Sequence, residues 1–250
     1  MDEIALVAVV AGAIFVGSTM QRIGGMGLGL VAAPILSFAI GPVQGILLIN
    51  VLACINSLMN SYSMRAGIDW AMVRLIGSVM IIGSLSGALL IRSISIPALQ
   101  VIVGASIVCA LCVVIFGKRF VPPARGKAPA LITGVIAGFT NTLAGVAGPV
   151  ITVYAQAAQW DHRRLASTLQ PLFVVCGLLS FLVKELSGTA SMGQLPWLIW
   201  PVSCLTMVAA IALGARLSAK INREAARRFS IILAFAGSLS VLIRGLYALL

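Results

Sequence analysis

The sequence predicts an all-α, polytopic membrane protein with two inverted repeats, each a glycine-broken helical hairpin followed by three transmembrane helices. Three observations support this fold class. The 250 residues are 60% apolar and only 9% charged, which leaves little room for a soluble protein. Apolar runs of about 20 residues, enough to cross a bilayer, fill almost the whole chain. Glycine-rich segments interrupt the runs at corresponding places, within 16–36 and 133–152.

The N-terminal repeat is expected over residues 1–117. Its first apolar segment, 4–40, is too long for one crossing and has glycines in its middle, so we predict a broken hairpin of two helices. Three apolar runs of spanning length follow, and they predict helices at about 43–64, 72–91 and 97–117. Residues 118–128, KRFVPPARGKA, are basic and contain two prolines, which indicates a cytoplasmic linker.

The C-terminal repeat is expected over residues 129–250 and has the same order. It begins with a broken hairpin at 129–159, and helices are predicted at about 165–186, 196–216 and 228–250. A shift of 121 residues superposes Gly17 on Gly138, Gly24 on Gly145 and Gly27 on Gly148. The shared order of break, apolar stretch, polar corner and apolar run is stronger support for a duplication than the glycines alone.

The positions of Lys and Arg predict the topology, because cytoplasmic helix ends collect basic residues. If each hairpin returns to its starting face, most of the basic residues lie inside, and only Arg92, Lys184 and Arg244 lie outside. Each half then crosses an odd number of times, so the halves are inverted. We expect a multi-pass protein of the bacterial inner membrane with both termini periplasmic. The net charge of +11 is then a topology signal with some contact to anionic lipid, and does not indicate nucleic-acid binding.

Catalytic and cofactor motifs are not found in the sequence. The glycines of GGMGLG lack the acidic residue that a nucleotide fold places about 20 positions later, and no histidine–glutamate metalloprotease motif is present. The five cysteines all lie in apolar runs. We therefore expect no enzyme activity, no cofactor and no metal site.

The glycine breaks predict an anion site. A helix that stops inside the membrane leaves backbone N–H groups without partners, and its N-terminus carries roughly half a positive charge. The returning arms start near Met26 and Ala147, and inversion would aim both at the membrane midplane. Glycines permit close approach of an anion to such a helix end, although the same glycines could serve only close helix packing.

Polar side chains near the breaks extend the candidate site. Arg22 and Gln21 either contact the anion, or Arg22 reaches the cytoplasmic side and caps carbonyls at the hairpin tip. Under the 121-residue shift Asn50 corresponds to Pro171 and Ile49 to Gln170, so Gln170 is the expected counterpart of Asn50 in the other half. The expected substrate-binding residues are Gln21, Arg22, Gly24, Gly25, Met26, Gly27, Asn50, Asn141, Thr142, Gly145, Val146, Ala147, Gly148, Pro149 and Gln170.

Two segments, GGMGLGLVAAP and LAGVAGP, resemble the duplicated glycine–proline signature of the TauE/SafE family of membrane permeases. The resemblance covers essentially the whole chain, including the central basic linker. The first copy departs from the pattern, because no proline follows Gly27 directly and Pro34 comes later. The resemblance implies transport of sulfite, sulfonates and related sulfur-containing anions, and one branch resembles an uptake permease for toluene sulfonate.

We therefore expect a secondary transporter that moves organosulfonates such as toluene sulfonate, in the uptake direction, by alternating access at a midplane site. Export of sulfite or a small sulfonate is one alternative. A passive anion channel is another, because helix N-termini also line anion pores. The expected partners are the small anion, membrane lipid and a coupling cation, unless the gradient of the anion itself drives transport.

Overall fold

The computed structural model describes residues 3–24, 27–116, 123–124, 126–218 and 220–249, and the candidate residues Gly25 and Met26 lie outside them. Within the described residues the chain is helical and contains no strand. Six helical segments are long and apolar enough to cross a membrane. They are Glu3–Gly24, Pro42–Gly67, Trp70–Ser93, His162–Leu186, Ile199–Leu217 and Glu224–Tyr247. The predicted all-α polytopic class is confirmed.

Each glycine-rich segment separates two helices that turn back on each other. In the first hairpin α1 (Glu3–Gly24) is followed by α2 (Leu28–Ala39), and in the second α7 (Ala128–Ala144) is followed by α8 (Gly148–Ala157). Gly145 ends α7 with a left-handed backbone (φ 68°), a conformation that glycine adopts without steric cost.

Three further spans follow each hairpin. After α2 come α3 (Pro42–Met64), the 3₁₀ turn η1 (Arg65–Gly67), α4 (Trp70–Gly77), α5 (Met80–Ser93) and α6 (Ile96–Phe116). After α8 come α9 (His162–Leu186), the 3₁₀ turn η3 (Met192–Gln194), α10 (Ile199–Leu217) and α11 (Arg223–Tyr247).

The segment Trp70–Ser93, which covers the span predicted over 72–91, contains an interruption and consists of α4 and α5. The interruption lies at Ser78 and Val79, directly after Gly77. The Ser78 hydroxyl donates to the Leu75 carbonyl (3.0 Å), a side-chain bond that competes with the helical pattern. Glycine and serine in succession therefore permit a bend that apolar periodicity does not reveal.

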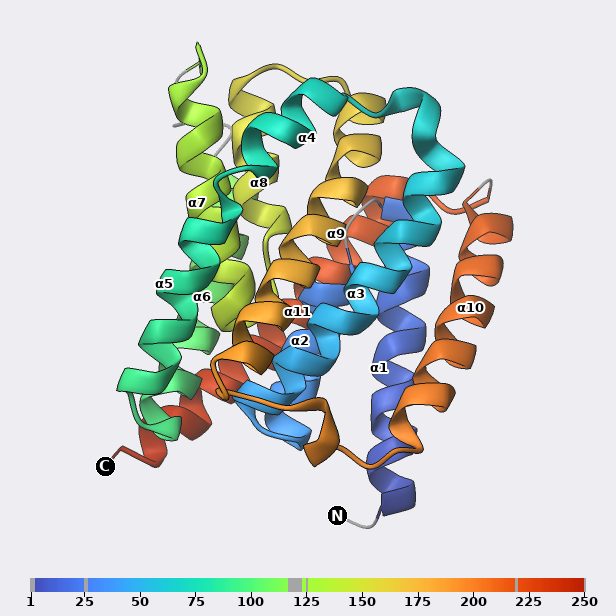
Figure 1. The fold of residues 1–250 in the computed structure, drawn as a ribbon. Helices are drawn as coiled ribbons and strands as arrows, with labels where there is room; N and C mark the ends of the chain where they lie inside the picture. Colours follow the sequence, from blue (N-terminus) through green and yellow to red (C-terminus); the bar gives the residue numbers. More distant parts are fainter. Residues whose placement is uncertain (1–2, 25–26, 117–122, 125, 219, 250) are drawn as a thin grey trace.

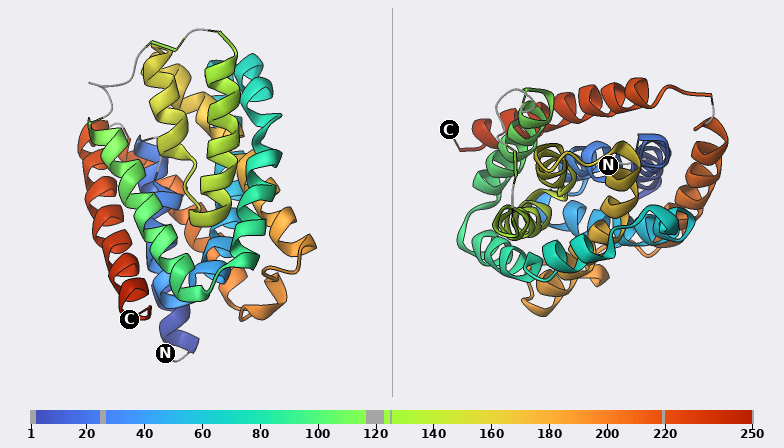
Figure 2. Two further views of the ribbon diagram at one scale, coloured as in Figure 1. Left: turned by 90° about the vertical axis from the view of Figure 1, so that its left-hand side faces the viewer. Right: turned by 90° about the horizontal axis from the view of Figure 1, so that it is seen from above.

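Helices from opposite halves of the chain pack in pairs. The most extensive contacts join α5 to α7, α1 to α10, α3 to α9 and α6 to α11. Seen from above in Figure 2, the two hairpins lie toward the centre, and α5, α6, α10 and α11 run around them. Glycines allow the close approach: a Cβ at Gly83 or Gly138 would overlap a backbone carbonyl across the α5–α7 contact. The two halves are therefore interlocked.

The helix boundaries around the two breaks repeat at a spacing of 120 residues. Helices α1 and α7 end at Gly24 and Ala144, and α2 and α8 begin at Leu28 and Gly148. The N-cap residues of α3 and α9, Gly41 and Asp161, have the same spacing. These helix ends differ by one residue from the 121-residue shift that aligns the glycines, and the duplication itself stays a prediction.

Both chain termini lie at one end of the molecule (Figure 1). The α3–α4 and α8–α9 connections lie at the opposite end; Arg65 lies in the first connection, and Arg163 and Arg164 lie in the first turn of α9. Which side of the membrane each end faces stays a prediction, with the termini expected on the outer face. We refer below to the end with the termini as the terminal face and to the other as the basic face.

Candidate functional site

The two helix breaks meet at the centre of the molecule. Gly29, in the first turn of α2, lies so close to Gly145 that a Cβ on Gly29 would overlap the Gly145 carbonyl oxygen. Gly27 packs equally closely on α1, where a Cβ would lie 2.6 Å from the Gln21 nitrogen. Between the breaks is a cavity of about 30 Å³, lined by Gln21, Gly27, Gly29, Leu30, Ala53, Asn141, Gly145, Val146, Ala147, Gly148, Phe173 and Gly177. We call it the central cavity; it has room for two or three water molecules at most.

Gln21 connects the first break to the other half of the chain. Its side chain is 3% exposed. Its Oε1 accepts a hydrogen bond from the Leu28 N–H at the start of α2 (3.1 Å). Its Nε2 donates to Ser57 Oγ (3.0 Å) and to Gln170 Oε1 (3.3 Å). One amide therefore caps the N-terminus of α2 and links α1 to α3 and α9.

Asn141 has the corresponding position beside the second break. Its Nδ2 lies 3.1 Å from Asn50 Oδ1, 2.9 Å from Ser180 Oγ and 3.2 Å from the Cys176 carbonyl oxygen. The Gly145 N–H donates to the Asn141 carbonyl (2.8 Å), which closes the last turn of α7. The Asn50 Nδ2 group is buried and has no hydrogen-bond partner within the described residues. The site therefore has a buried donor that a small acceptor could satisfy.

The structure brings most of the predicted site residues together. Seven of them line the central cavity: Gln21, Gly27, Asn141, Gly145, Val146, Ala147 and Gly148. Asn50 and Gln170 stand one hydrogen bond behind it, and Thr142 bonds Ser180 (2.8 Å) beside Asn141. Arg22 and Gly24 line a different cavity, described below. Pro149 lies elsewhere, in an apolar groove that α6, α7 and α8 form on the outside of the bundle.

Five residues that line the central cavity are absent from the predicted set. They are Gly29, Leu30, Ala53, Phe173 and Gly177. Three of them carry a detectable signal, because Ala53 is three positions after Asn50 and Phe173 and Gly177 are three and seven after Gln170. That spacing puts them on the same helix faces as the predicted amides. Leu30 carries no signal that separates it from other apolar residues.

A larger pair of adjoining cavities opens beside the C-terminal end of α1. They have volumes of about 370 and 280 Å³ and share Gly24, His162 and Ala166 in their linings. We call them together the basic vestibule, because they are also lined by Arg22, Arg163 and Arg227, with Glu224 as the acidic residue. His162 is exposed at the first position of α9. The lining therefore contains more basic than acidic side chains.

Arg22 contacts the wall of the vestibule. Its guanidinium Nη1 donates to Asn60 Oδ1 (3.1 Å) and to Ser63 Oγ (2.7 Å), both on α3. It does not line the central cavity, although Gln21, the preceding residue, does. The position of Arg22 fits a residue that attracts an anion before the anion reaches the central cavity.

Replacing Arg22 by alanine should therefore slow transport at low anion concentration and leave the maximal rate nearly unchanged. The loss of one positive charge from the approach lowers the local anion concentration, by several-fold at low salt and less at high salt. Initial rates of anion transport at two ionic strengths would measure this, with Arg22→Lys as the matched control. A fall in the maximal rate that salt does not alter would contradict an approach role.

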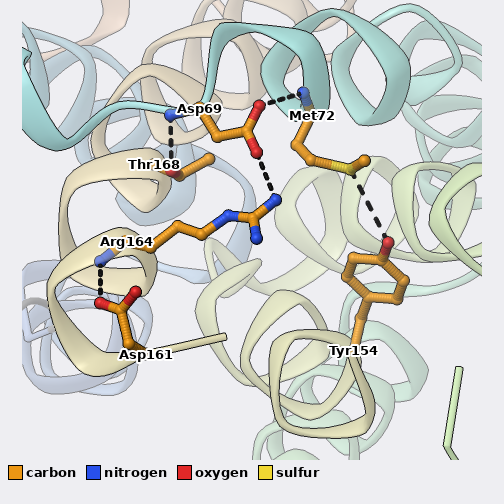
Figure 3. A network of polar contacts seen from close by, with 6 residues as sticks. All are labelled: Asp69, Met72, Tyr154, Asp161, Arg164 and Thr168. Atoms are coloured by element: carbon orange, nitrogen blue, oxygen red, sulfur yellow. Dashed lines mark hydrogen bonds and ion pairs between the residues drawn. The ribbon is translucent and has the colours of Figure 1, made fainter. Parts of the chain in front are cut away.

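A polar network braces the basic face (Figure 3). Arg164 on α9 forms an ion pair with Asp69, which also caps α4 by accepting from the Met72 N–H (3.0 Å). The Asp69 N–H donates to Thr168 Oγ1 (3.1 Å), and the Arg164 guanidinium stacks on the Trp160 ring at 4.8 Å. The network therefore ties the α3–α4 corner to the α8–α9 corner.

The ion pair gives a pH-dependent stability. Burial raises the pKa of Asp69, but the Met72 N–H and the Arg164 guanidinium lower it by more, so the pKa lies below its ordinary value of 3.8. A carboxyl group with a lowered pKa in the fold stabilises it above the unfolded-state pKa, and the contribution is lost as pH falls through the folded-state pKa. Asp69→Asn should therefore destabilise the protein at pH 7 by on the order of 1 kcal/mol, since the pair is partly exposed.

The measurement is thermal unfolding in detergent from pH 7 down to pH 3. We expect the difference between wild type and Asp69→Asn to begin to shrink below about pH 4, where Asp69 becomes protonated in the unfolded state, and to be lost only as pH falls through the lower pKa of the folded state. A difference that stays constant to pH 3 would mean that the cap on α4, and not the charge, accounts for the effect.

Comparison with family models decides the family of the chain. Residues 9–241 match the model described as Sulfite exporter TauE/SafE. The chain belongs to this family. Comparison with curated proteins and with solved structures gave no match.

TauE/SafE proteins are membrane transporters, so the chain is a transporter of small sulfur-containing anions and not an enzyme. The residues that line the central cavity are all uncharged, and the polar ones present amides and backbone groups from two helix breaks. Neutral donors of this kind can hold an anion and still release it.

Proposed function

We propose that this TauE/SafE protein carries organosulfonates across the membrane by alternating access, and that the central cavity binds the sulfonate group. The observation that carries the proposal is the meeting of the two helix breaks at one small cavity beside buried amides. The N-termini of α2 and α8 supply oriented N–H groups, and neither has a capping side chain from its own N-cap residue. A sulfonate has three acceptor oxygens for such donors.

The inverted repeat belongs to this proposal, and the spacing of 120 residues supports it. Adding 120 to Gln21 gives Asn141, and subtracting 120 from Gln170 gives Asn50. The hydrogen bond between Gln21 and Gln170 therefore has its counterpart in the bond between Asn141 and Asn50. The same relation between the halves converts the α1–α10 pair into the α7–α5 pair. It converts the α3–α9 pair and the α6–α11 pair each into itself. Equivalent bonds on both sides of the cavity are what a pseudo-twofold axis through it would produce.

The position of the basic vestibule suggests which part of the molecule moves. The larger cavity of the vestibule lies between the α1–α10 pair and the α3–α9 pair, since its lining comes from α1, α3, α9 and the end of α10. Because α1 packs on α10 and α5 packs on α7, separating the two repeats as whole bodies would break both contacts. We propose that α1–α10 and α5–α7 tilt in turn against a central α3–α9 pair, so that each face opens in its own step.

The size of the central cavity bears on the substrate. A cavity of about 30 Å³ admits a group of only a few atoms. Toluene sulfonate would need the cavity to widen beside Leu30, Ala53 and Phe173, which form an apolar wall suited to its ring. Sulfite requires less movement, so its export is the second candidate function. Uptake remains our first proposal; because a negative membrane potential opposes anion entry by about 2.3 kcal/mol per charge per 100 mV, uptake requires a coupling cation or consumption of the anion.

Transport into proteoliposomes tests the proposal. Purified protein would be reconstituted, and entry of labelled toluene sulfonate measured with pH, sodium and voltage gradients imposed one at a time, with sulfite and taurine as competitors. Saturable uptake that responds to one gradient is the expected result. Sulfite transport without toluene sulfonate transport would establish the second candidate, and flux that never saturates would establish a passive channel instead of a carrier.

A further inference from the structure

Lys184 is the one Lys, Arg, Asp or Glu residue that is fully buried in the described part of the chain. Its exposed fraction is 0%, and its Nζ atom has no hydrogen-bond partner among the described residues. The carboxylate of the neighbouring residue, Glu185, is directed to other donors: it accepts hydrogen bonds from Ser191 Oγ (2.9 Å) and from the Met192 N–H (3.1 Å). An uncompensated ammonium group in a protein interior is costly, so this position needs an explanation.

The 120-residue spacing connects Lys184 to the basic vestibule. Subtracting 120 from Lys184 gives Met64, which lines that vestibule at the end of α3. Two other residues of the lining, Ala166 and Ser167, correspond to Ile46 and Leu47. These counterparts are closed in the structure, with exposed fractions of 0% for Lys184, 1% for Ile46 and 0% for Leu47. Met64, Ala166 and Ser167 thus line an open cavity on the basic face, whereas their counterparts near the terminal face are buried by packing.

We propose that Lys184 is an anion-binding residue of a second vestibule, which opens to the terminal face when the basic vestibule closes. The inference rests on the proposed alternating-access function. In the closed arrangement seen here Lys184 lacks both water and a partner. In the open arrangement water reaches the ammonium group, and a sulfonate or sulfite oxygen can accept its N–H groups. The free-energy cost of burying Lys184 also destabilises the arrangement in which the terminal face is closed, and so favours the open one.

This vestibule would differ chemically from the basic one. The basic vestibule contains Arg22, and the equivalent position on the other side is Thr142, which is buried and bonds Ser180. Lys184 therefore supplies on the terminal side the positive charge that Arg22 supplies on the basic side, but from α9 instead of from the hairpin. Each face would have its own cation at the approach to a central cavity whose lining is uncharged.

Accessibility gives the first test. Lys184→Cys would be made in a variant whose five cysteines are replaced by alanine, and labelled with a membrane-impermeant maleimide from the terminal face. We expect labelling from that face, and slower labelling when toluene sulfonate is present. Met64→Cys is the matched control and should be labelled from the basic face only. Failure of Lys184→Cys to react from the terminal face, while Met64→Cys reacts from the basic face, would overturn the proposal.

Transport gives the second test and separates this inference from the proposed function. Lys184→Met should raise the half-saturating anion concentration at the terminal face about ten-fold or more, with little change at the basic face, and Lys184→Arg should restore most of the affinity. Arg92→Gln is the control, because it removes an exposed charge near the same end. Wild-type protein that does not transport would refute the proposed function. Wild-type protein that transports, with Lys184→Met unchanged at the terminal face, would refute only the role of Lys184.

Discussion

Gly29→Ala is expected to reduce anion transport at least ten-fold. The added Cβ would overlap the carbonyl oxygen of Gly145, so the two helix breaks could meet only if one backbone segment moved. Overpacking of this kind typically costs about 1–3 kcal/mol, and here the strain falls on the two segments that form the central cavity. The measurements are initial transport rates in proteoliposomes and thermal unfolding in detergent.

Gly12→Ala is the matched control for that change. It makes the same substitution inside α1, but a Cβ at Gly12 would have no heavy atom within 4 Å. It should therefore retain transport and leave stability equal or slightly higher, because alanine favours a helix over glycine. If Gly29→Ala transported as well as Gly12→Ala, the close contact between the breaks would not be required for transport.

Gln21→Glu is expected to abolish anion binding while the fold is kept. The glutamate has nearly the same shape, and its carboxylate can still accept from the Leu28 N–H. Toward Ser57, to which the Gln21 amide donates, the carboxylate would accept from the hydroxyl instead. Its negative charge would stand in the lining of the central cavity, where it repels an anion in a poorly hydrated site. We expect the binding affinity for toluene sulfonate or sulfite to fall by at least a hundred-fold, measured by calorimetry or by competition with transport.

Ser95→Asp is the control for adding an acidic residue. Ser95 is exposed near the terminal face, where its hydroxyl accepts from the Ala98 N–H, and aspartate can make the same cap. It adds the same charge far from the cavity and should leave anion affinity unchanged. Equal affinity in Gln21→Glu and wild type would place the anion somewhere other than the central cavity.

The helices that cross the membrane could be predicted from the sequence because each prediction rests on a local property. Runs of apolar residues reveal the spans, and glycine-rich interruptions reveal the two breaks. The apolar run gives no sign of the interruption at Ser78 and Val79 within the span Trp70–Ser93. The predicted 121-residue shift follows glycine identity, whereas the helix ends at the two breaks are 120 residues apart.

From the sequence, the candidate site could be predicted mainly for residues that are close in sequence to the two glycine breaks. Gln21 and Asn141 are next to the glycines, and both line the central cavity. Pro149 is equally close in sequence but lies in an outer groove, because successive residues of a helix point in different directions. Phe173 and Gly177 lie far along the chain, and only the packing of α9 against α3 brings them to the cavity.

The sequence by itself determined the membrane class, the helical spans and the two interruptions, since hydrophobicity, helix length and glycine content act within one segment. Only the tertiary structure decided that the breaks touch each other, that Arg22 lines a vestibule and not the cavity, and that Lys184 is fully buried. These depend on which helix faces meet. That is a property of pairs of segments far apart in the chain, such as α1 with α10 and α3 with α9.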